Sequence, residues 1–547
     1  MITSDNDLPE GQVLTAVGGP LELPEDQQEM MVAISIARSR GKTKECWALY
    51  VEGKKNVQFM ALIQRAEQAG YNVSKRDSID EATLRLLYDR NLQQASQEAQ
   101  DQSKIIEFFD GVVNDALAEG VSDIHIEKRA HGAIIKMRKH GEMLEYRELS
   151  STHAYELCSV VYNVLAENRD IVFNDMEYQQ AAINRVIEGI ELKLRYQSLP
   201  VYPDGFDVVL RVLPIGKNEE YVPLEKLGYT PSQISLLMDI VSQPVGTLVI
   251  AGTTGSGKST TLKNLLMYIH SERQFKDKIY TVEDPPEYKI PRVSQIPVIR
   301  RKGDDYTKKS PFEAPITACM RADPDILMIG EVRDEATGDL LKKAVQSGHQ
   351  VLTTVHTSSA LAIVDRFEDF NMSRSVLGSQ QFIAGLCYQK LVPILCPRCS
   401  VSLKEAVVAE GAKERDLMLW DRLKKVCDPE ADPVHVRGPG CDECGNLGVV
   451  DRTVCAEIIM PDTKMLTLFR ESKSIEAFTH WRSMSDRDPY SPNMVGKSAM
   501  EHAMLKLRKG HVSPHDVESA FGPITPLALG LVTQEELDEQ RKEQQQK

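Results

Sequence analysis

The sequence predicts an α/β protein with a parallel, doubly wound sheet, and three observations support this fold class. Four apolar strand candidates alternate with helical or loop segments in the second half of the chain, as in parallel sheets covered by helices. A glycine-rich phosphate-loop pattern lies between the first of these strands and a helix. Residues 105–215 hold one helix and several short, turn-separated β-rich runs, which predict an α+β domain ahead of the sheet.

Length and composition limit the class of protein. A chain of 547 residues with 42% hydrophobic residues can bury several cores, about three to four domains at the usual domain size. The start MITSDNDLPEG lacks the features of a secretion signal, and no apolar run approaches about 18 residues, so we expect a cytoplasmic protein. The net charge of −15 disfavours a nucleic-acid partner. Ten cysteines without a secretion signal favour thiols or metal ligands over disulfides.

The first 95 residues predict a leader followed by a small α/β domain. Residues 1–24 combine Pro, Gly and acidic residues with little periodicity and predict a loose leader. Residues 46–51 predict a strand, residues 57–70 a helix, and ATLRLLYDRNL a second helix. The polar residues 93–104 predict a linker or a solvated helix end. This domain is either a docking module or an added structural domain.

The next two domains are predicted over residues 105–215 and 225–390. In the first, a helix around 105–118 precedes the strand candidates VSDIHIEK, GAIIKMRKHGEML, IELKLRYQSLP and FDVVLRVLP. In the second, a helix over 230–243 precedes the strand candidates GTLVIAG, KIYTVED, DILMIGE and HQVLTTVHT. Helical segments are also predicted in the C-terminal region, which ends in TQEELDEQRKEQQQK with a capping box from Thr533 and Glu536.

The run GTTGSGKS matches the phosphate-loop pattern GxxxxGK[ST] and lies between a strand and a helix. Its glycines let backbone N–H groups surround phosphate oxygens, its lysine neutralises the β and γ phosphates, and the Ser259 hydroxyl can ligate Mg²⁺. ATP or GTP binding is therefore predicted. The predicted binding residues are Gly252, Thr253, Thr254, Gly255, Ser256, Gly257, Lys258, Ser259 and Thr260.

Three acidic residues end predicted strands of the same sheet. Glu283 and Asp284 end the strand of TVEDPPEY, and Glu331 ends DILMIGE, where an Asp is usual in phosphate-loop ATPases. Phosphoryl transfer is catalysed mostly by placement and charge, and doubly wound folds bind ligands at this edge of the sheet. Glu331 leaves two possibilities open at this point, a variant site or a broken one.

Two CxxC pairs predict a metal site. Cys396 and Cys399 form the first pair, and Cys441 and Cys444 form the second. Four thiolates with no open position favour a structural Zn²⁺, although the sequence does not distinguish zinc from iron. The segment between the pairs is predicted to be helical. The remaining cysteines are interpreted as small buried hydrophobic residues: Cys46, Cys158, Cys319, Cys387, Cys427 and Cys455.

Taken together, the motifs resemble those of the secretion and pilus ATPases that power type II secretion and type IV pilus assembly. The resemblance rests on GTTGSGKSTTL as Walker A, TVEDPPEY as the Asp box, RADPDILMIGEVRD as the atypical Walker B and SGHQVLTTVHT as the His box, in family order. It implies a RecA-like core preceded by an α+β, PAS-like domain. It also implies a tetracysteine module over residues 391–460 and a helical C-terminal region over residues 461–547.

The resemblance assigns roles to the residues that match these motifs. In this family the Walker B run ends in Gly-Glu, so Glu331 would be the catalytic or metal-orienting acid. Glu283 and Asp284 would align water and metal. Either His349 or His356 would sense the γ-phosphate.

Arginines complete the site that the resemblance implies. Arg321 and Arg333 match family arginines that pair with phosphate or with carboxylates of another subunit. Arg195 and Arg211 would reach the phosphates from the preceding domain. Where the family commonly has Arg-x-Arg-x-Asp-Gly, this chain has KMRKHG over residues 136–141, without the Asp.

The function implied is an ATP-hydrolysing ring motor, a homo-oligomer expected to be a hexamer. It would act at the cytoplasmic face of the inner membrane, reaching the membrane through a platform protein of the pilus or secretion machine. The tetracysteine module matches assembly rather than retraction ATPases, and the unusual N-terminal domain fits a type IVb or conjugative-plasmid pilus. Two alternatives stay open, a DNA translocase or helicase on a RecA-like core and a nucleotide-binding scaffold without turnover.

Overall fold

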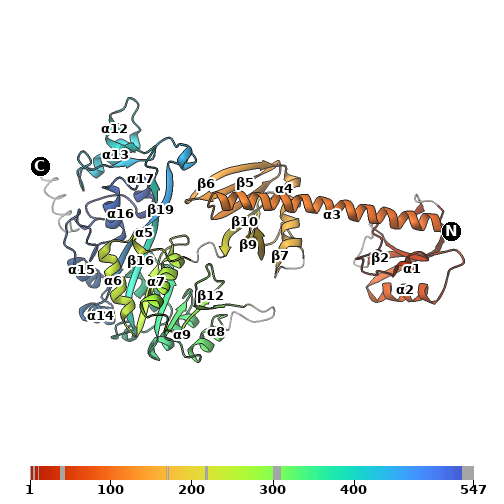
Figure 1. Cartoon of the computed structure of the whole chain (residues 1–547), viewed down its shortest axis with the longest axis horizontal. Helices are drawn as coiled ribbons and strands as arrows, with labels where there is room; N and C mark the ends of the chain where they lie inside the picture. Colours follow the sequence, from red (N-terminus) through yellow and green to blue (C-terminus); the bar gives the residue numbers. More distant parts are fainter. Residues whose placement is uncertain are drawn as a thin grey trace. The chain divides into compact units, whose positions relative to one another are not determined.

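The computed structural model shows two compact units. One comprises residues 1–114 with 152–165, and the other comprises residues 115–151 with 166–547 (Figure 1). Thr533 and Glu536 of the predicted capping box lie outside the described residues. The structure describes residues 2–3, 7–9, 11–36, 44–167, 169, 172–215, 220–299 and 310–531.

The first unit contains a three-stranded sheet in the order β1-β2-β3. Strand β2 pairs antiparallel with β1 and parallel with β3. Helix α2 begins at the N-cap Asn56, whose side chain accepts the backbone N–H of Phe59, and buries an apolar face at helical spacing. The bounds are α1 Glu25–Gln28, β1 Met31–Ser35, β2 Lys44–Val51, α2 Val57–Gln68 and β3 Tyr71–Ile79.

The prediction of a loose leader is wrong for residues 11–23. Leu14 and Leu21 are buried, and the N–H of Leu14 donates to the carbonyl of Ala33 in β1 at 2.8 Å. Their side chains join the cluster beneath α2. The segment lacks strand or helix periodicity because it turns repeatedly along the sheet, so its burial leaves no regular pattern in the sequence.

Leu14→Ala is expected to lower the local free energy of unfolding of the first unit by about 2–5 kcal/mol, because it opens a cavity in this cluster. Hydrogen exchange of the β1 amides measures the effect. Val17→Ala is the matched control, since Val17 is 71% exposed and its loss should change stability by less than about 0.5 kcal/mol. Equal exchange rates in the two variants would mean that the leader does not contribute to the core.

Helix α3 runs without interruption from Glu81 to Ala118, 38 residues. Of the two alternatives for residues 93–104, the linker is wrong, and the helix end is right only in that these residues are helical, because they lie in the middle of α3. The two predicted helices on either side are one. Gln, Glu and Ala favour the helix even without an apolar face, and extending an existing helix costs little per residue. It is followed later in the chain by α4 (Ser151–Val160) and a single π-helical turn at Val161–Leu165.

The second unit begins with an antiparallel seven-stranded sheet in the order β6-β5-β4-β10-β9-β8-β7. Three of the four strands predicted in residues 105–215 are confirmed, and the fourth candidate, GAIIKMRKHGEML, is a hairpin that holds β5 and the start of β6. The two-residue strand β7 was not predicted, and β8 was missed because polar residues occupy much of it. The bounds are β4 Asp123–Arg129, β5 Gly132–Lys139, β6 Glu142–Leu149, β7 Ala166–Glu167, β8 Gln179–Ile187, β9 Ile190–Val201 and β10 Gly205–Ile215.

A second seven-stranded sheet follows in the order β13-β12-β14-β15-β11-β16-β19. The first six strands are parallel, which confirms the predicted parallel sheet, and β19 is an antiparallel addition. The sequence did not predict β13, β16 or β19. The bounds are β11 Gly246–Ala251, β12 Ile279–Glu283, β13 Ser294–Pro297, β14 Ile326–Ile329, β15 Gln350–Val355, β16 Ile383–Leu395 and β19 Val449–Ile459.

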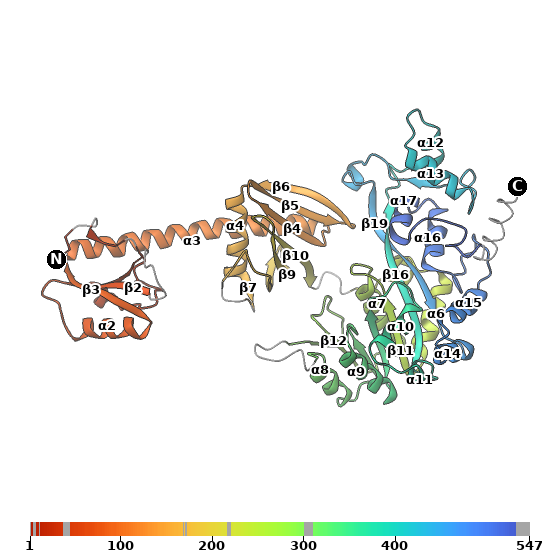
Figure 2. The ribbon, with the colours of Figure 1, turned by 180° about the vertical axis from the view of Figure 1, so that it is seen from behind.

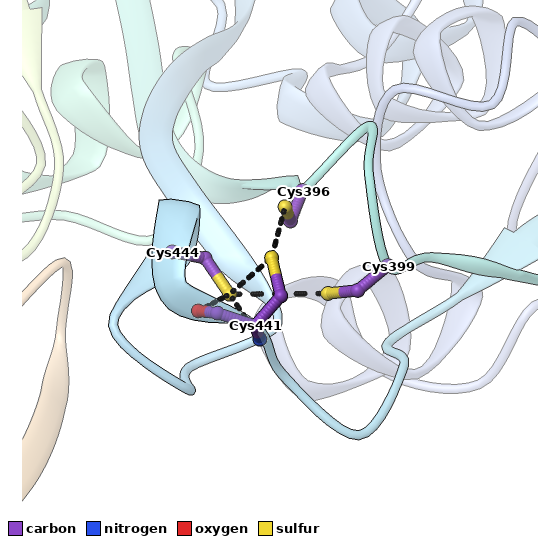
Figure 3. Close-up of side chains that lie close together, drawn as sticks. All are labelled: Cys396, Cys399, Cys441 and Cys444. Atoms are coloured by element: carbon purple, nitrogen blue, oxygen red, sulfur yellow. Dashed lines mark hydrogen bonds between the residues drawn. The ribbon is translucent and has the colours of Figure 1, made fainter.

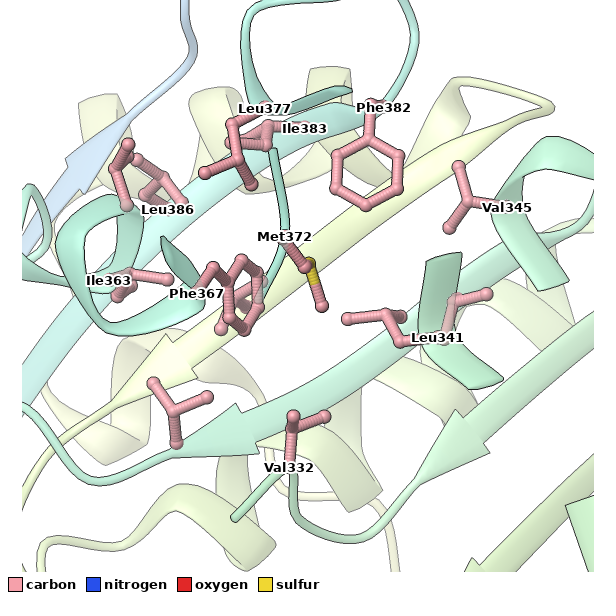
Figure 4. Close-up of a cluster of buried hydrophobic side chains, with 14 of the residues drawn as sticks. Val332, Leu341, Val345, Ile363, Phe367, Met372, Leu377, Phe382, Ile383 and Leu386 are labelled. Carbon is pink, nitrogen blue, oxygen red and sulfur yellow. The ribbon is translucent and has the colours of Figure 1, made fainter. Parts of the chain in front are cut away.

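Helices cover both faces of this sheet, as expected for a doubly wound fold (Figure 2). Helices α6 and α7 bury apolar side chains on one face, and α8 to α11 bury theirs on the other. Figure 4 shows Leu341, Phe367 and Met372 packed together in the apolar cluster on the face covered by α8 to α11. The bounds are α5 Leu224–Leu227, α6 Pro231–Ser242, α7 Lys258–Glu272, α8 Glu313–Met320, α9 Glu335–Gln346, α10 Ala362–Asp369 and α11 Arg374–Leu377.

Helices α12, α13, α16 and α17 pack around one further apolar cluster, which includes Val392, Leu419, Trp420 and Leu507, whereas α14 and α15 bury their apolar side chains with those of α8 to α11. The segment between the cysteine pairs contains two helices, α12 and α13, as predicted, and also the two-residue strands β17 and β18. No helix within the described ranges is long and apolar enough to cross a bilayer. The bounds are β17 Val401–Ser402, α12 Leu403–Val408, α13 Glu414–Leu423, β18 His435–Val436, α14 Thr463–Arg470, α15 Ser474–Ser483, α16 Ala499–Leu507 and α17 Pro514–Phe521.

Candidate nucleotide site and metal centre

The phosphate-loop residues 252–259 connect the carboxyl end of β11 to the first turn of α7. Gly255 and Gly257 have φ angles of 76° and 83°, a left-handed conformation that favours glycine. The free N–H groups at the start of α7 make this end of the helix attractive to anions. The loop therefore has the backbone geometry that phosphate binding requires.

Lys258 is the first residue of α7, and its side chain folds over the loop. Its Nζ donates to the carbonyl oxygens of Gly252 at 2.8 Å and Thr253 at 3.0 Å. Burial lowers the pKa of Lys258, while the nearby carboxylates of Glu331 and Glu287 oppose this shift. The ammonium group is thus held at the loop, where it can neutralise phosphate charge.

Glu283 is the last residue of β12 and is held by two neighbours. Its Oε1 accepts the Thr281 hydroxyl at 2.6 Å and the Gln295 amide at 3.0 Å. Burial raises the pKa of Glu283, and these two hydrogen bonds partly offset the effect. Asp284 follows directly and lies 3.5 Å from the guanidinium of Arg333.

Glu331 follows β14 at the same edge of the sheet. A Cβ on Gly330 would lie 3.1 Å from the carbonyl oxygen of Val282, so a glycine lets this chain segment pass close to β12. Glu331 Oε1 lies 3.2 Å from His356 Nε2, and Oε2 lies 3.2 Å from Arg333 Nε. The carboxylate is thus oriented from both sides.

The two candidate histidines lie at opposite ends of β15. His356 follows its carboxyl end and contacts Glu331, whereas His349 precedes its amino end and bonds the carbonyl of Ala344 through Nδ1 at 3.0 Å. A strand of this length separates them by about 20 Å. Of the two, His356 alone lies at this phosphate loop. Burial and the charge of Lys258 lower the pKa of His356, and Glu331 opposes the shift.

A pocket of about 830 Å³ in the second unit contains the loop and these side chains. Arg195 and Arg211, which face each other across β9 and β10, also line it. Arg211 Nε donates to the Asp123 carboxylate at 3.0 Å. Arg321 lies outside the pocket, directly after α8. The predicted site residues that line it are Thr254, Gly255, Ser256, Gly257, Lys258, Ser259, Thr260, Glu283, Asp284, Glu331, Arg333, His356, Arg195 and Arg211.

Sequence reasoning missed three polar residues at this site. Tyr288 bonds the Thr260 hydroxyl at 3.1 Å, Arg452 lines the pocket, and Gln389 donates to the carbonyl of Ser256 at 2.7 Å. Tyr288 ends the run TVEDPPEY and could have been found from it. Gln389 lies in the run YQKLVPILC, which resembles a family motif, so that run could have pointed to it, whereas Arg452 lies in β19, where no motif was recognised.

The four cysteines of the two CxxC pairs meet at one point (Figure 3). Their sulfur atoms all lie within 4.8 Å of one another, and three of the pairs are 3.7–3.8 Å apart. A tetrahedral site with Zn–S bonds of about 2.3 Å places its sulfurs about 3.8 Å apart. The four side chains therefore fit a single tetrahedral metal ion.

Backbone geometry supports this cluster. A Cβ on Gly438 would lie 1.5 Å from the carbonyl oxygen of Cys399, so a glycine there lets the two knuckles approach. The N–H groups of Cys441 and Gly448 each lie 3.2 Å from the Cys444 sulfur. Although burial opposes ionisation, these hydrogen bonds lower the pKa of Cys444 to about 6. Thiolate is the form that binds metal.

A phosphate loop between strand and helix, with carboxylates on neighbouring strands, defines the class of phosphate-loop ATPases. Comparison with known proteins identifies the group within this class. The family model of type II/IV secretion system proteins matches residues 98–501, and the chain belongs to this family. The chain is an ATPase motor for pilus assembly or secretion.

Individual relatives agree with this assignment. The chain is 32% identical to type II secretion system protein E of Pseudomonas aeruginosa over 382 residues, 70% of each chain. It is 30% identical to the type IV pilus assembly ATPase PilB of Thermus thermophilus, covering 67% of this chain and 38% of that protein. The solved ATPase DotB of Legionella pneumophila shares the fold, with 19% identity, a TM-score of 0.50 and coverage of 75% and 94%.

Proposed function

We propose that this chain is a RecA-like ring motor that couples ATP hydrolysis to assembly of a type IV pilus or a type II secretion filament. The observation that supports this function best is the convergence of Lys258, Glu331 and His356 at the phosphate loop. The Glu in place of Asp is then a variant of the acidic site. Its carboxylate lies 3.2 Å from both Arg333 Nε and His356 Nε2, so charged or polar groups surround it as they would a working acid.

In this proposal the loop N–H groups and Lys258 hold the β and γ phosphates, and Glu331 orients and polarises the attacking water. Glu283 and Asp284 supply two further carboxylates, which would align the water and the metal. Mg²⁺, when bound, neutralises phosphate charge, and the Ser259 hydroxyl is the protein group that fits it in the phosphate-loop pattern. His356 Nε2 lies 3.2 Å from the working carboxylate, and we propose that it responds to the γ-phosphate.

Arginines from the preceding α+β, PAS-like domain are proposed to complete the nucleotide site. Arg195 and Arg211 lie on adjacent strands, and Asp123 holds Arg211 in place. Their positive charge suits phosphate, so nucleotide would draw that domain and the core together and release would separate them. A homo-oligomeric ring, a hexamer, would propagate this cycle between subunits.

The tetracysteine cluster is proposed to hold a structural Zn²⁺. Its four thiolates leave no open position for substrate, which separates it from catalytic zinc sites. Holding residues 396–399 and 441–444 together would stabilise the segment between them, which includes α12 and α13. The module is the feature that favours assembly over retraction.

The cellular setting is likewise a proposal. We infer that the motor acts at the cytoplasmic face of the inner membrane on a platform protein, as the resemblance to secretion and pilus ATPases implies. The family match begins at residue 98 and does not include residues 1–97. A type IVb or conjugative-plasmid pilus is the system we propose.

Steady-state phosphate release from the purified chain with Mg-ATP tests the proposal, measured with and without DNA. Turnover that is independent of DNA is the expected result. Turnover that requires DNA would favour a translocase or helicase. Absence of turnover at concentrations that support oligomers, with nucleotide still bound, would favour a non-hydrolysing scaffold.

The pH dependence of turnover tests the role of His356. Because its pKa is lowered from the usual value of about 6.5, the imidazole should be neutral at pH 7. As the pH falls, protonation of His356 would turn its contact with Glu331 into an ion pair and lower the rate of ATP hydrolysis. We expect the midpoint of this acid limb below pH 6.5 and expect His356→Gln to shift it. His349→Gln, at the far end of β15, should leave the profile unchanged. A midpoint above pH 6.5 would contradict this role.

A further inference from the structure

A buried glutamine connects the phosphate loop to a distant tyrosine. Gln389 on β16 is fully buried, and its Nε2 donates to the Ser256 carbonyl at 2.7 Å. Its Oε1 accepts the Tyr229 hydroxyl at 2.7 Å. The amide orientation follows from its partners, because a carbonyl can only accept. Burial raises the pKa of Tyr229, so its phenol keeps the proton that it donates.

The loop lies directly on this part of β16. A Cβ on Gly252 would come within 2.4 Å of the Gln389 carbonyl oxygen, and a Cβ on Gly257 would come within 3.2 Å of its Nε2. Two loop glycines are therefore needed for close approach to Gln389, in addition to their conformational role. Movement of the loop relative to β16 must disturb this contact.

Helix α7 also holds the segment 220–229, which enters the core after β10. Lys263 Nζ donates to the Glu220 carbonyl at 2.9 Å, and the Val222 N–H donates to Asn264 Oδ1 at 2.7 Å. Near the end of the segment, the Tyr229 hydroxyl lies 3.2 Å from the Thr261 hydroxyl. The helix that begins with the phosphate-binding lysine thus contacts both ends of the segment.

These polar groups are almost completely enclosed. Lys263 is 3% exposed, Asn264 is fully buried and Tyr229 is 3% exposed. An unpaired polar group in such a place costs more than a typical hydrogen bond contributes, so the arrangement tolerates few alternatives. A change in loop geometry is therefore expected to be passed on through the hydrogen bonds.

We propose that Gln389 and Tyr229 are positioning residues that couple the geometry of the phosphate loop to the segment 220–229. The inference rests on the proposed function, because it requires nucleotide at that loop. Nucleotide phosphates order the loop carbonyl of Ser256, Gln389 follows it, and Tyr229 transmits the change to the segment. Neither residue touches nucleotide in this scheme.

Tyr229→Phe tests the coupling, because it removes one oxygen atom and leaves the ring. Mg-ADP and a non-hydrolysable Mg-ATP analogue are the probes, and their Kd is measured by calorimetry. Loss of one hydrogen bond is expected to weaken binding about fivefold. Tyr388→Phe is the matched control, since Tyr388 is the neighbouring residue of β16 and packs into the cluster on the opposite face.

Hydrogen exchange supplies a readout that a purely structural role would not change. In the unaltered protein, saturating analogue should slow exchange of the amides from Val222 to Tyr229. In Tyr229→Phe this slowing should be lost at saturation, whereas Tyr388→Phe should retain it. Gln389→Leu should lose it as well. If Gln389→Leu does not fold, Tyr229→Phe decides alone.

Two outcomes would overturn the coupling. One is a Kd in Tyr229→Phe equal to that of the unaltered protein, and the other is retained slowing over residues 222–229 at saturation. Failure of the unaltered protein to bind either probe is a different result, because it would overturn the proposed function itself.

Discussion

Glu331→Gln is expected to lower the kcat of ATP hydrolysis by about 10²–10⁴-fold, the usual contribution of a proton-accepting side chain. The amide keeps the size of the side chain but loses the charge that polarises water. The lost charge also faces Arg333, whose Nε lies 3.2 Å from Glu331 Oε2. Nucleotide affinity should change little, because the loop N–H groups and Lys258 supply most of the contacts to phosphate.

Phosphate release and analogue binding measured on the same preparation separate the two effects. Glu335→Gln is the matched control. Glu335 lies four residues further along and bonds Asn371 at 2.7 Å on the exposed side of α9. Its replacement should leave kcat unchanged. Equal rates for Glu331→Gln and the unaltered protein would transfer the role to another carboxylate, with Glu283 the next candidate.

Cys441→Ser is expected to abolish stoichiometric metal binding and to destabilise the segment between the cysteine pairs. Binding of a structural zinc ion contributes about 10–16 kcal/mol in small zinc domains, and a serine hydroxyl is a poor replacement for a thiolate. The helices between the cysteine pairs pack into the apolar core that includes Leu419 and Leu507. Loss of the metal should therefore expose residues 400–440 to proteolysis before the rest of the core.

Metal analysis of the purified protein and limited proteolysis measure the two parts of this prediction. Cys427→Ser is the matched control, because Cys427 lies in the same segment but outside the cluster. It should keep about one ion per chain. Metal analysis also distinguishes zinc from iron. The tetracysteine site would be abandoned if the unaltered protein held neither metal at close to one per chain.

The reliability of the sequence predictions follows from how local each signal is. The strands β11, β14 and β15 are apolar runs bounded by polar residues, so their composition alone identifies them. The buried leader around Leu14 has no such pattern, because its side chains are enclosed by turns packed on β1. Likewise, β13 is only four residues long and half-buried, which leaves no periodic signal.

The same distinction applies to the site. The residue types of GTTGSGKS are by themselves sufficient to predict phosphate binding, since glycines permit the positive φ angles and lysine supplies the positive charge. The predicted parallel sheet already places His356, after the carboxyl end of its strand, at the ligand edge, and the parallel pairing of β15 with β11 and β14 separates it from His349. Ligand chemistry predicted that the two CxxC motifs bind one ion. The need for glycine at position 438 is seen only in the structure, where a Cβ would lie 1.5 Å from the carbonyl oxygen of Cys399.

Chemistry that resides in one short segment could be inferred from the amino acids alone, and this includes nucleotide binding, the candidate acids and the cysteine ligands. Contacts between distant segments could not. Ser256 and Gln389 are 133 residues apart and meet because β11 and β16 are neighbours in the sheet. The order of the strands depends on how side chains pack on both faces of the sheet, and that packing energy is distributed over the whole core. A loop conformation, by contrast, depends mainly on the residues within the loop.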